Sequence, residues 1–251
     1  MIDPTNESKL DTLVMIKNEG DSTLNKILDV NKTLLGRASS FITLALGVIG
    51  FILALLSYIL NDLIVPEDNS AIIKIYDNFA LICAISIAFV LLSILLGLSL
   101  YLSPEKVMFS LGPNQIELYE KYKDKSKEEL TNTLIRGNSL DIKICEFMNM
   151  KIARHILTMS TLIFCGIILF SYSFLPLMDP QDMIDNGDKY DFYLAQIGLL
   201  FCVSVAGVVS IWWKMHNKIK GKYKEVMEIN NKYPHYDKAD LDKIMEVRYG
   251  R

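Results

Sequence analysis

Four long stretches without a single Asp, Glu, Lys or Arg constrain this sequence more than any other feature. They span residues 38–61, 78–104, 155–178 and 192–213, and each has more than 20 residues. About 20 helical residues cross the roughly 30 Å apolar core of a bilayer. A mean hydropathy of +0.27 would suit a soluble protein, but this segregation of charge excludes one soluble domain, a disordered chain and a disulfide-stapled secreted module. We therefore expect an all-α, polytopic membrane protein with four transmembrane helices.

The same stretches divide the chain into five segments. These are an N-terminal segment 1–37, a first transmembrane hairpin 38–104, a middle segment 105–154, a second transmembrane hairpin 155–213 and a C-terminal tail 214–251. Apolar residues in the three flanking segments recur at three- and four-residue spacing, which is typical of amphipathic helices. The pattern predicts helical extensions of the spans outside the membrane.

Local signals predict where these extensions begin and end. Gly20-Asp21-Ser22 is expected to interrupt the first helix, with Asp21 or Ser22 as the N-cap of the helix that follows. Ser126 and Glu129 form a capping box, from which one helix is expected to run directly into the third span.

The tail and two Pro-containing turns carry further signals. After the fourth span, the tail is expected to be helical to about Asn231, to stop near Pro234 and to resume over 239–247. Ser103-Pro104 is expected to end the second span, and Gly112-Pro113 marks a turn in the middle segment.

Basic residues lie almost entirely on one side of the predicted membrane. Of 26 Lys and Arg, 24 fall in the three flanking segments, and the connectors 62–77 and 179–191 hold only Lys74 and Lys189 beside nine acidic residues. The positive-inside rule places both termini and the middle segment in the cytoplasm. Because 37 residues with eleven charges precede the first span, no cleavable signal peptide is expected. The predicted location is the cell (inner) membrane, with several spans.

The charged segments indicate a lipid partner rather than a nucleic acid. They mix both signs and lack a basic face with interleaved aromatic residues. Two runs of lysines lie close to the spans and are expected to meet anionic lipid headgroups. They are Lys121, Lys123, Lys125 and Lys127, and Lys214, Lys218, Lys220, Lys222 and Lys224.

No residue constellation predicts catalysis, a metal centre or a cofactor. His155, His216 and His235 have no second His or Cys at ligand spacing, and the four cysteines contain no CxxC. The aspartates of the second connector resemble a calcium loop, but Ile184 and Tyr193 occupy positions that need oxygen ligands. A solvated acidic turn is the favoured interpretation, and a soft divalent-cation site is the alternative.

The composition of the spans bears on transport. Proton- or sodium-driven carriers place acidic or basic groups within the membrane, whereas these spans have none, and Pro176 and Pro180 fall at a span end. Small residues four apart predict close helix packing, either within one chain or in an oligomer in which a polar stripe lines a pore. Ser86, Gln196 and Ser204 are the candidate pore-lining or helix-packing residues.

The two halves of the chain share a faint pattern. Lys32 precedes Gly47 by 15 residues, as Lys151 precedes Gly166, and a Tyr-Asp pair lies ahead of the second and of the fourth span. Both halves have the same orientation, so a duplication would be parallel. A true duplication and a chance match both remain open.

Two stretches resemble known membrane proteins. The run 29–35 (DVNKTLL), together with Ser103-Pro104-Glu105, is similar to the two-span modules of antiviral membrane effectors of the cyclic-nucleotide-signalling type. The middle stretch resembles uncharacterised four-span prokaryotic proteins in its Gly112-Pro113, Tyr119, Tyr122, Ser126, Glu128-Glu129-Leu130 and Lys151-Ile152-Ala153. Together these cover about half the chain. The resemblance implies a membrane effector that responds to a signalling nucleotide.

These observations favour a non-enzymatic, homo-oligomeric membrane protein that couples a cytoplasmic signal to membrane permeability, as in antiviral defence. The alternative is a membrane scaffold that docks a soluble cytoplasmic partner through its helices, with Leu130, Leu134 and Ile142 as contact residues. An enzyme acting on lipid is the least favoured class, since no set of acid, base and nucleophile faces the bilayer.

Overall fold

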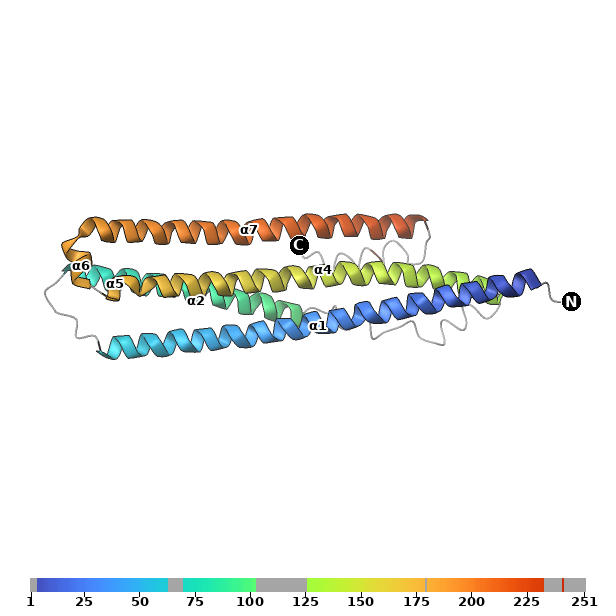
Figure 1. Ribbon diagram of the computed structural model, residues 1–251, viewed down its shortest axis with the longest axis horizontal. Helices are drawn as coiled ribbons and strands as arrows, with labels where there is room; N and C mark the ends of the chain where they lie inside the picture. The colour runs from blue at the N-terminus through green and yellow to red at the C-terminus, as the bar shows by residue number, and fades with distance from the viewer. Residues whose placement is uncertain (1–3, 63–69, 103–125, 179, 233–240, 242–251) are drawn as a thin grey trace. The chain divides into compact units, whose positions relative to one another are not determined.

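The computed structural model describes residues 4–62, 70–102, 126–178, 180–232 and Leu241, and within these residues every regular element is a helix. The helices are α1 (Pro4–Asp62), α2 (Ser70–Leu102), α4 (Lys127–Ser173), α5 (Leu175–Met178), α6 (Pro180–Asp185) and α7 (Gly187–Lys232). Figure 1 shows the four long helices as uninterrupted ribbons. The predicted all-α fold is confirmed.

Four helical regions are long and apolar enough to cross a membrane, as predicted. They lie within 13–59, 72–100, 127–178 and 187–232. The third region combines α4 with α5, and Pro176 is the second residue of α5. The chain is therefore a four-span helical protein.

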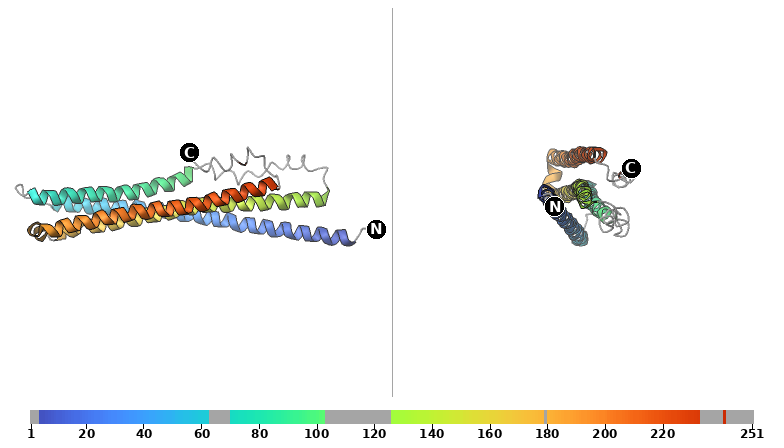
Figure 2. Two further views of the ribbon diagram at one scale, coloured as in Figure 1. Left: turned by 90° about the horizontal axis from the view of Figure 1, so that it is seen from above. Right: turned by 90° about the vertical axis from the view of Figure 1, so that its right-hand side faces the viewer.

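The helices divide into two compact units by their contacts. We call residues 36–100 and 154–214 the membrane unit, and residues 1–35, 101–153 and 215–251 the extension unit. These limits fall within four residues of the segment boundaries expected from the charge pattern. Because α1, α4 and α7 are continuous helices, each contributes to both units (Figures 1 and 2).

The core of the membrane unit is built around α4. One cluster joins α1, α2 and α4 through Ile52, Phe79, Cys83 and Phe170, and a second joins the same helices through Ala45, Val90 and Ile163. A third brings α7 against α2 and α4, with Ile75, Ile82, Leu169, Tyr190, Tyr193 and Ile197. In the most apolar 18 residues of each span, 44% are buried in the α4–α5 region and none in α7. α4 is thus the central helix of this unit, and α7 is the most peripheral.

The core of the extension unit joins α4 to α7. From α4 it contains Leu140, Ile144, Phe147 and Met148, which recur at helical spacing, and from α7 it contains Ile219 and Val226. Phe147 is completely buried, and full burial of such a side chain contributes about 1.5–3 kcal/mol. This apolar stripe explains why the two helices extend beyond the membrane spans.

The start of α4 follows the predicted capping signal. The backbone N–H of Glu129 donates to Ser126 Oγ at 3.2 Å, and that of Leu130 donates to the Ser126 carbonyl at 2.9 Å. Glu128 and Glu129 occupy the first turn, where negative charge complements the helix dipole. The prediction of one helix from this cap into the third span is confirmed.

The predicted interruption at Gly20-Asp21-Ser22 is wrong, because α1 continues through these residues. Asp21 is not an N-cap, since its carboxylate pairs with Lys17, one turn earlier, at 2.7 Å and accepts a hydrogen bond from Asn138 of α4 at 2.6 Å. A Cβ added at Gly20 would lie 3.4 Å from the Asn138 amide. The glycine therefore allows a close approach to α4 rather than ending α1.

The connectors are more helical than expected. α2 begins at Ser70, eight residues before the expected start of the second span. In the second connector, where an acidic turn is expected, the turn is confined to Asn186 between α6 and α7, and the Lys189 N–H donates to the Asn186 carbonyl at 2.8 Å.

Three expectations fall partly or wholly outside the described residues. The turns at Ser103-Pro104 and Gly112-Pro113 lie there entirely. α7 ends at Lys232, close to the expected stop. Of the helix expected over 239–247, only Leu241 is described, and it is fully buried in the extension-unit core.

Candidate functional site

Ser86 lies at a contact between α2 and α4 in the membrane unit. Its side chain is fully buried, and its hydroxyl donates to the Ile82 carbonyl of the same helix at 2.9 Å. A Cβ added at Gly166 of α4 would lie 3.0 Å from the Ser86 carbonyl oxygen. Ser86 therefore lies where α2 and α4 approach each other.

Gln196 and Ser204 lie eight residues apart on α7, and both are half-buried. Eight residues correspond to about 12 Å along a helix. The neighbouring Ile197 belongs to the membrane-unit core, whereas the exposed Val203 and Val205 flank Ser204. The two polar side chains therefore lie at the margin between the packed and the exposed face of α7.

The small-residue pairs singled out in the sequence all lie on exposed faces of the membrane unit. Gly47 and Gly50 of α1 are exposed, and a Cβ added at either would meet nothing within 4 Å. The other members are also exposed, namely Ala84, Ala88, Cys202, Ala206 and Ser210. Three different helices thus present small residues outward.

Other small residues pack the interior of the membrane unit, and sequence spacing alone did not identify them. A Cβ added at Gly97 would lie 2.6 Å from Ile42 Cγ1 and 2.7 Å from Met159 Cε. At Gly166 it would lie 2.8 Å from Val90 Cγ2. These two glycines allow α1, α2 and α4 to approach closely. Gly166 appeared in the sequence only as a member of the possible repeat.

Hydroxyl and amide groups link the spans. Ser93 of α2 donates to the Met159 carbonyl of α4 at 3.2 Å. Tyr193 of α7 donates to the Tyr172 carbonyl of α4 at 2.7 Å. Asn78 of α2 donates from Nδ2 to the Tyr190 hydroxyl of α7 at 2.6 Å. In lipid, where apolar side chains gain nothing by leaving the solvent, such bonds contribute to helix association.

An aromatic–cation cluster joins α4 and α7 in the membrane unit. The Arg154 guanidinium carbon lies 4.0 Å from the centroid of the Trp212 ring, a cation–π geometry. The His155 ring meets the same indole edge-on, with centroids 5.8 Å apart. The sequence pattern placed these residues at the ends of two spans but did not pair them.

In the extension unit, four charged residues form a closed ring of ion pairs between α4 and α7. Lys143 lies 3.3 Å from Glu146 and 3.0 Å from Glu225. Lys222 lies 3.1 Å from Glu146 and 2.8 Å from Glu225. Each charge therefore has two neighbours of opposite sign, which aligns α4 with α7. The sequence pattern places Lys222 among the lysines expected to meet lipid headgroups, but its side chain is directed to these carboxylates.

The ring shifts the pKa of three of its members away from ordinary values. A hydrogen bond from Lys222, followed by one from Lys143, lowers the pKa of Glu225. Hydrogen bonding to Glu225 is the largest cause that raises the pKa of Lys143 and of Lys222. Lys143, Lys222 and Glu225 are therefore charged near neutral pH.

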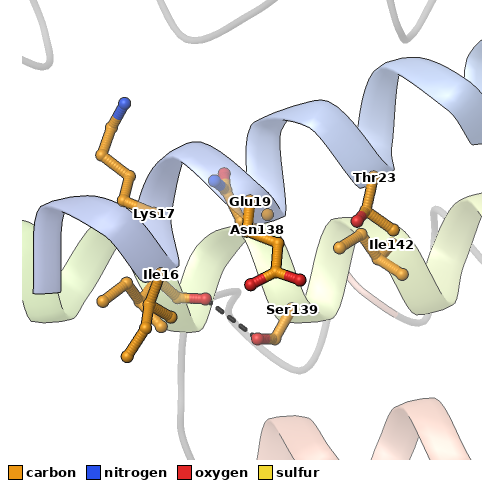
Figure 3. Close-up of a pocket in the computed structure, with 9 residues that line it drawn as sticks. Ile16, Lys17, Glu19, Thr23, Asn138, Ser139 and Ile142 are labelled. Carbon is orange, nitrogen blue, oxygen red and sulfur yellow. Dashed lines mark hydrogen bonds between the residues drawn. The ribbon is translucent and has the colours of Figure 1, made fainter. Parts of the chain in front are cut away.

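The crossing of α1 and α4 leaves a small cavity in the extension unit. It measures about 240 Å³, and Figure 3 shows Glu19 and Thr23 of α1 facing Ser139 and Ile142 of α4 across it. The Ser139 hydroxyl donates to the Ile135 carbonyl at 3.0 Å. Beside the cavity, hydrogen bonding to Lys17 lowers the pKa of Asp21. The cavity has both polar and apolar walls.

Among the described residues, no three His, Cys, Asp or Glu side chains come together as metal ligands. Asp185 and Asp188 are exposed. His235 lies outside the described residues.

Comparison with known proteins finds no match. No protein-family model, curated protein or solved structure matches this chain.

Proposed function

We propose that this protein is a non-enzymatic, homo-oligomeric effector of a prokaryotic inner membrane, which couples an intracellular signal to membrane permeability. In this proposal the extension unit lies in the cytoplasm and receives the signal, and the membrane units of several copies assemble around a path across the bilayer. A role in antiviral defence and a signalling nucleotide as the trigger follow from the resemblance of the first half of the chain to the two-span modules of antiviral membrane effectors.

The outward position of the small-residue pairs carries this proposal. Within one chain, close helix approach uses Gly97 and Gly166, whereas the pairs on α1, α2 and α7 lie on exposed faces. Small residues at helical spacing let helix backbones approach in lipid. In a membrane, a second copy of the chain can pack against each of these faces, so an oligomer accounts for the exposed small residues.

The polar groups inside one membrane unit favour a path between copies over a path through one copy. Ser86 and Thr158 donate to carbonyls of their own helices, and Ser93 donates to the Met159 carbonyl. These hydroxyls are engaged with backbone and buried. On α7, in contrast, Ser204 is half-buried and Ser210 is exposed, so they are available to an interface between copies.

Cysteine cross-linking tests the assembly. Cys202 is exposed, whereas Cys83, Cys145 and Cys165 are buried. Oxidation of native membranes with copper phenanthroline should therefore produce a disulfide-linked dimer that disappears in Cys202→Ser and persists in Cys165→Ser. Ala206→Leu, one turn from Cys202, should reduce the dimer because a large side chain separates the helices. A chain that stays monomeric under oxidation at every protein density contradicts the proposed assembly.

Flux measurements test the proposed activity. Purified protein in liposomes should release a trapped ion or dye after addition of extract from virus-infected cells, and Ala206→Leu should release less than wild type. Liposomes that stay sealed with cross-linked, oligomeric protein present would contradict the permeability function while leaving the oligomer intact.

Labelling tests the orientation. Asp185, the last residue of α6, is exposed, so a cysteine placed there should react with an impermeant maleimide on intact cells. Reaction only after the cells are opened would reverse the topology, and with it the cytoplasmic position of the extension unit.

A membrane scaffold is the second candidate, and exposed apolar residues on α1 favour it. Met15 and Ile16 are 72% and 46% exposed in the extension unit, where water rather than lipid is the expected surrounding. Leu130, Leu134 and Ile142 of α4, in comparison, are half-buried. If docking is the function, Met15→Glu should abolish recovery of a soluble partner, and Ala206→Leu should leave it unchanged.

A further inference from the structure

A cavity in the membrane unit lies where α1 ends and α5 follows α4. It measures about 390 Å³. Its walls come from Leu55, Tyr58 and Ile59 of α1, from Tyr76 of α2, and from the region of Phe174 to Met178. Pockets for small molecules typically measure about 300–1,000 Å³, so this cavity can hold part of a small molecule.

The inner wall of the cavity is a fixed part of the membrane-unit core. The Phe174 ring meets Phe79 edge-on, with centroids 5.4 Å apart, and Phe170 with centroids 4.9 Å apart. Leu55 and Ile59 pack against the same cluster, which contains the fully buried Ile52. These side chains hold one another in place, and they give the cavity an inner wall of carbon atoms.

The mouth of the cavity has a different character. Tyr58 is 67% exposed and Met178 is 80% exposed, so the cavity opens past these two residues. Among the described residues that line it, hydroxyl groups belong only to Tyr58 and Tyr76. Tyr58 lies four residues before the end of α1 at Asp62. Tyrosines near helix ends mark the level of lipid headgroups, so the polar groups of this cavity lie toward the interface and its apolar wall toward the bilayer core.

We infer that this cavity binds one acyl chain of a membrane lipid, whose ester or headgroup lies at Tyr58 and Tyr76. The cavity opens past the exposed Tyr58 and Met178 of the membrane unit, to which the bilayer supplies amphipathic molecules at high concentration. An acyl chain matches the carbon lining, and the two hydroxyls match the polar end of the same molecule. The inference requires membrane insertion but depends neither on oligomerisation nor on permeability.

Photolabelling with a lipid tests the inference. The full-length protein is reconstituted in phosphatidylcholine vesicles that contain a small fraction of phosphatidylcholine with a diazirine on one acyl chain. After irradiation, mass spectrometry should place the label mainly within 55–59 and 174–178. Equal labelling of the exposed Leu46, Leu91 and Leu199 on other faces would identify only surrounding bilayer lipid and overturn the inference.

Two variants separate the cavity from its surroundings. Leu55→Trp fills the cavity and should lower labelling at 174–178 about tenfold, which corresponds to about 1.4 kcal/mol of binding. Leu53→Trp, two residues away on the 53% exposed side of the same helix, should leave that labelling unchanged. Equal labelling in the two variants would overturn the inference.

A third variant covers the case in which Leu55→Trp does not fold. Tyr58→Ala changes a largely exposed side chain at the mouth, so the fold should be retained, which circular dichroism can verify. It should reduce both the labelling and the lipid that stays with the protein through detergent washing. Retention at the wild-type level, close to one lipid per chain, would show that the mouth does not hold the headgroup and would contradict the inference.

Discussion

The two units of this protein hold their helices together by different means. In the membrane unit, α2 and α4 approach where Gly97 and Gly166 leave no room for a side chain, and Ser93 donates across the contact. In the extension unit, α4 and α7 share an apolar cluster around Phe147 and a closed ring of four ion pairs.

The difference follows from the solvent of each unit. In water, burial of apolar surface stabilises the contact at about 25 cal/mol per Å², and charged residues beside it provide register. Lipid is as apolar as the side chains, so close packing and hydrogen bonds have to hold the spans together. One helix, α4, uses both sets of contacts along its length, which makes its two halves respond to different perturbations.

The largest effect is expected from Gly166→Val in the membrane unit. A Cβ at this position lies 3.0 Å from the Ser86 carbonyl oxygen, and a backbone atom cannot move aside as a flexible side chain can. Overpacking of this kind costs about 1–3 kcal/mol, so thermal unfolding in detergent should occur at a distinctly lower temperature. Gly47→Val is the matched control, because its Cβ meets nothing within 4 Å in one chain. Equal destabilisation by both variants would contradict the close approach at Gly166.

An intermediate effect is expected from Glu225→Lys in the extension unit. The change places three lysines around the single carboxylate of Glu146, and an exposed ion pair contributes about 0.2–1 kcal/mol. With two pairs lost and partial exposure of the ring, a destabilisation of about 1 kcal/mol is expected, and it should decrease with added salt. Glu228→Lys, on the exposed side of the same helix, makes the same charge change outside the ring. If both variants unfold alike, the ring does not stabilise the contact.

Local signals made most of the fold predictable. The absence of charge located the spans, and the Ser126 cap located the start of α4 because a cap depends on residues three or four apart. The break expected at Gly20 failed because the role of that glycine is decided by Asn138, which reaches Asp21 from 117 positions away in the chain. A glycine that ends a helix and a glycine that admits a neighbouring helix look alike in one sequence.

The candidate site was less predictable, because it too depends on contacts between residues that are far apart in the sequence. The spacing of Ala84 and Ala88 indicated a packing face but not whether a helix of the same chain covers it. Glu146 and Lys222 are 76 residues apart, and nothing in either segment indicates their pairing. The resemblance in the positions of Lys32 and Lys151 does not extend to their surroundings, since Lys32 has an 81% exposed side chain and Lys151 is only 7% exposed.

A smaller effect is expected when a single hydrogen bond between spans is removed. Ser93→Ala deletes the donor to the Met159 carbonyl, and such bonds contribute about 0.6 kcal/mol on average in membrane proteins. Ser99→Ala removes a hydroxyl that donates at 2.7 Å to the Leu96 carbonyl of its own helix, so it serves as the control. The difference between their unfolding midpoints measures the contact between α2 and α4. A Ser93→Ala protein as stable as the control would assign the contact to glycine packing alone.

The smallest effect is expected from pH, through Asp21, Lys143, Lys222 and Glu225 of the extension unit. The pKa values of Asp21 and Glu225 are lowered in the folded protein, so their stabilisation is complete above the unfolded values near pH 4 and is lost as the pH falls through the folded values. The pKa values of Lys143 and Lys222 are raised, so their stabilisation is lost only as the pH rises beyond about 10.4. After screening by solvent, each group should contribute a few tenths of a kcal/mol.

The unfolding midpoint, followed by circular dichroism, should therefore be level between about pH 5 and 10 and fall slightly on either side. The double variant Asp21→Asn, Glu225→Gln should lose much of the fall on the acidic side and retain part of that on the basic side, since Glu146 still faces both lysines. If the unfolding midpoint of this variant falls at acidic pH as much as that of the wild type, other carboxylates cause the response. Charge pairing by Asp21 and Glu225 would then not be what distinguishes the extension unit from the membrane unit.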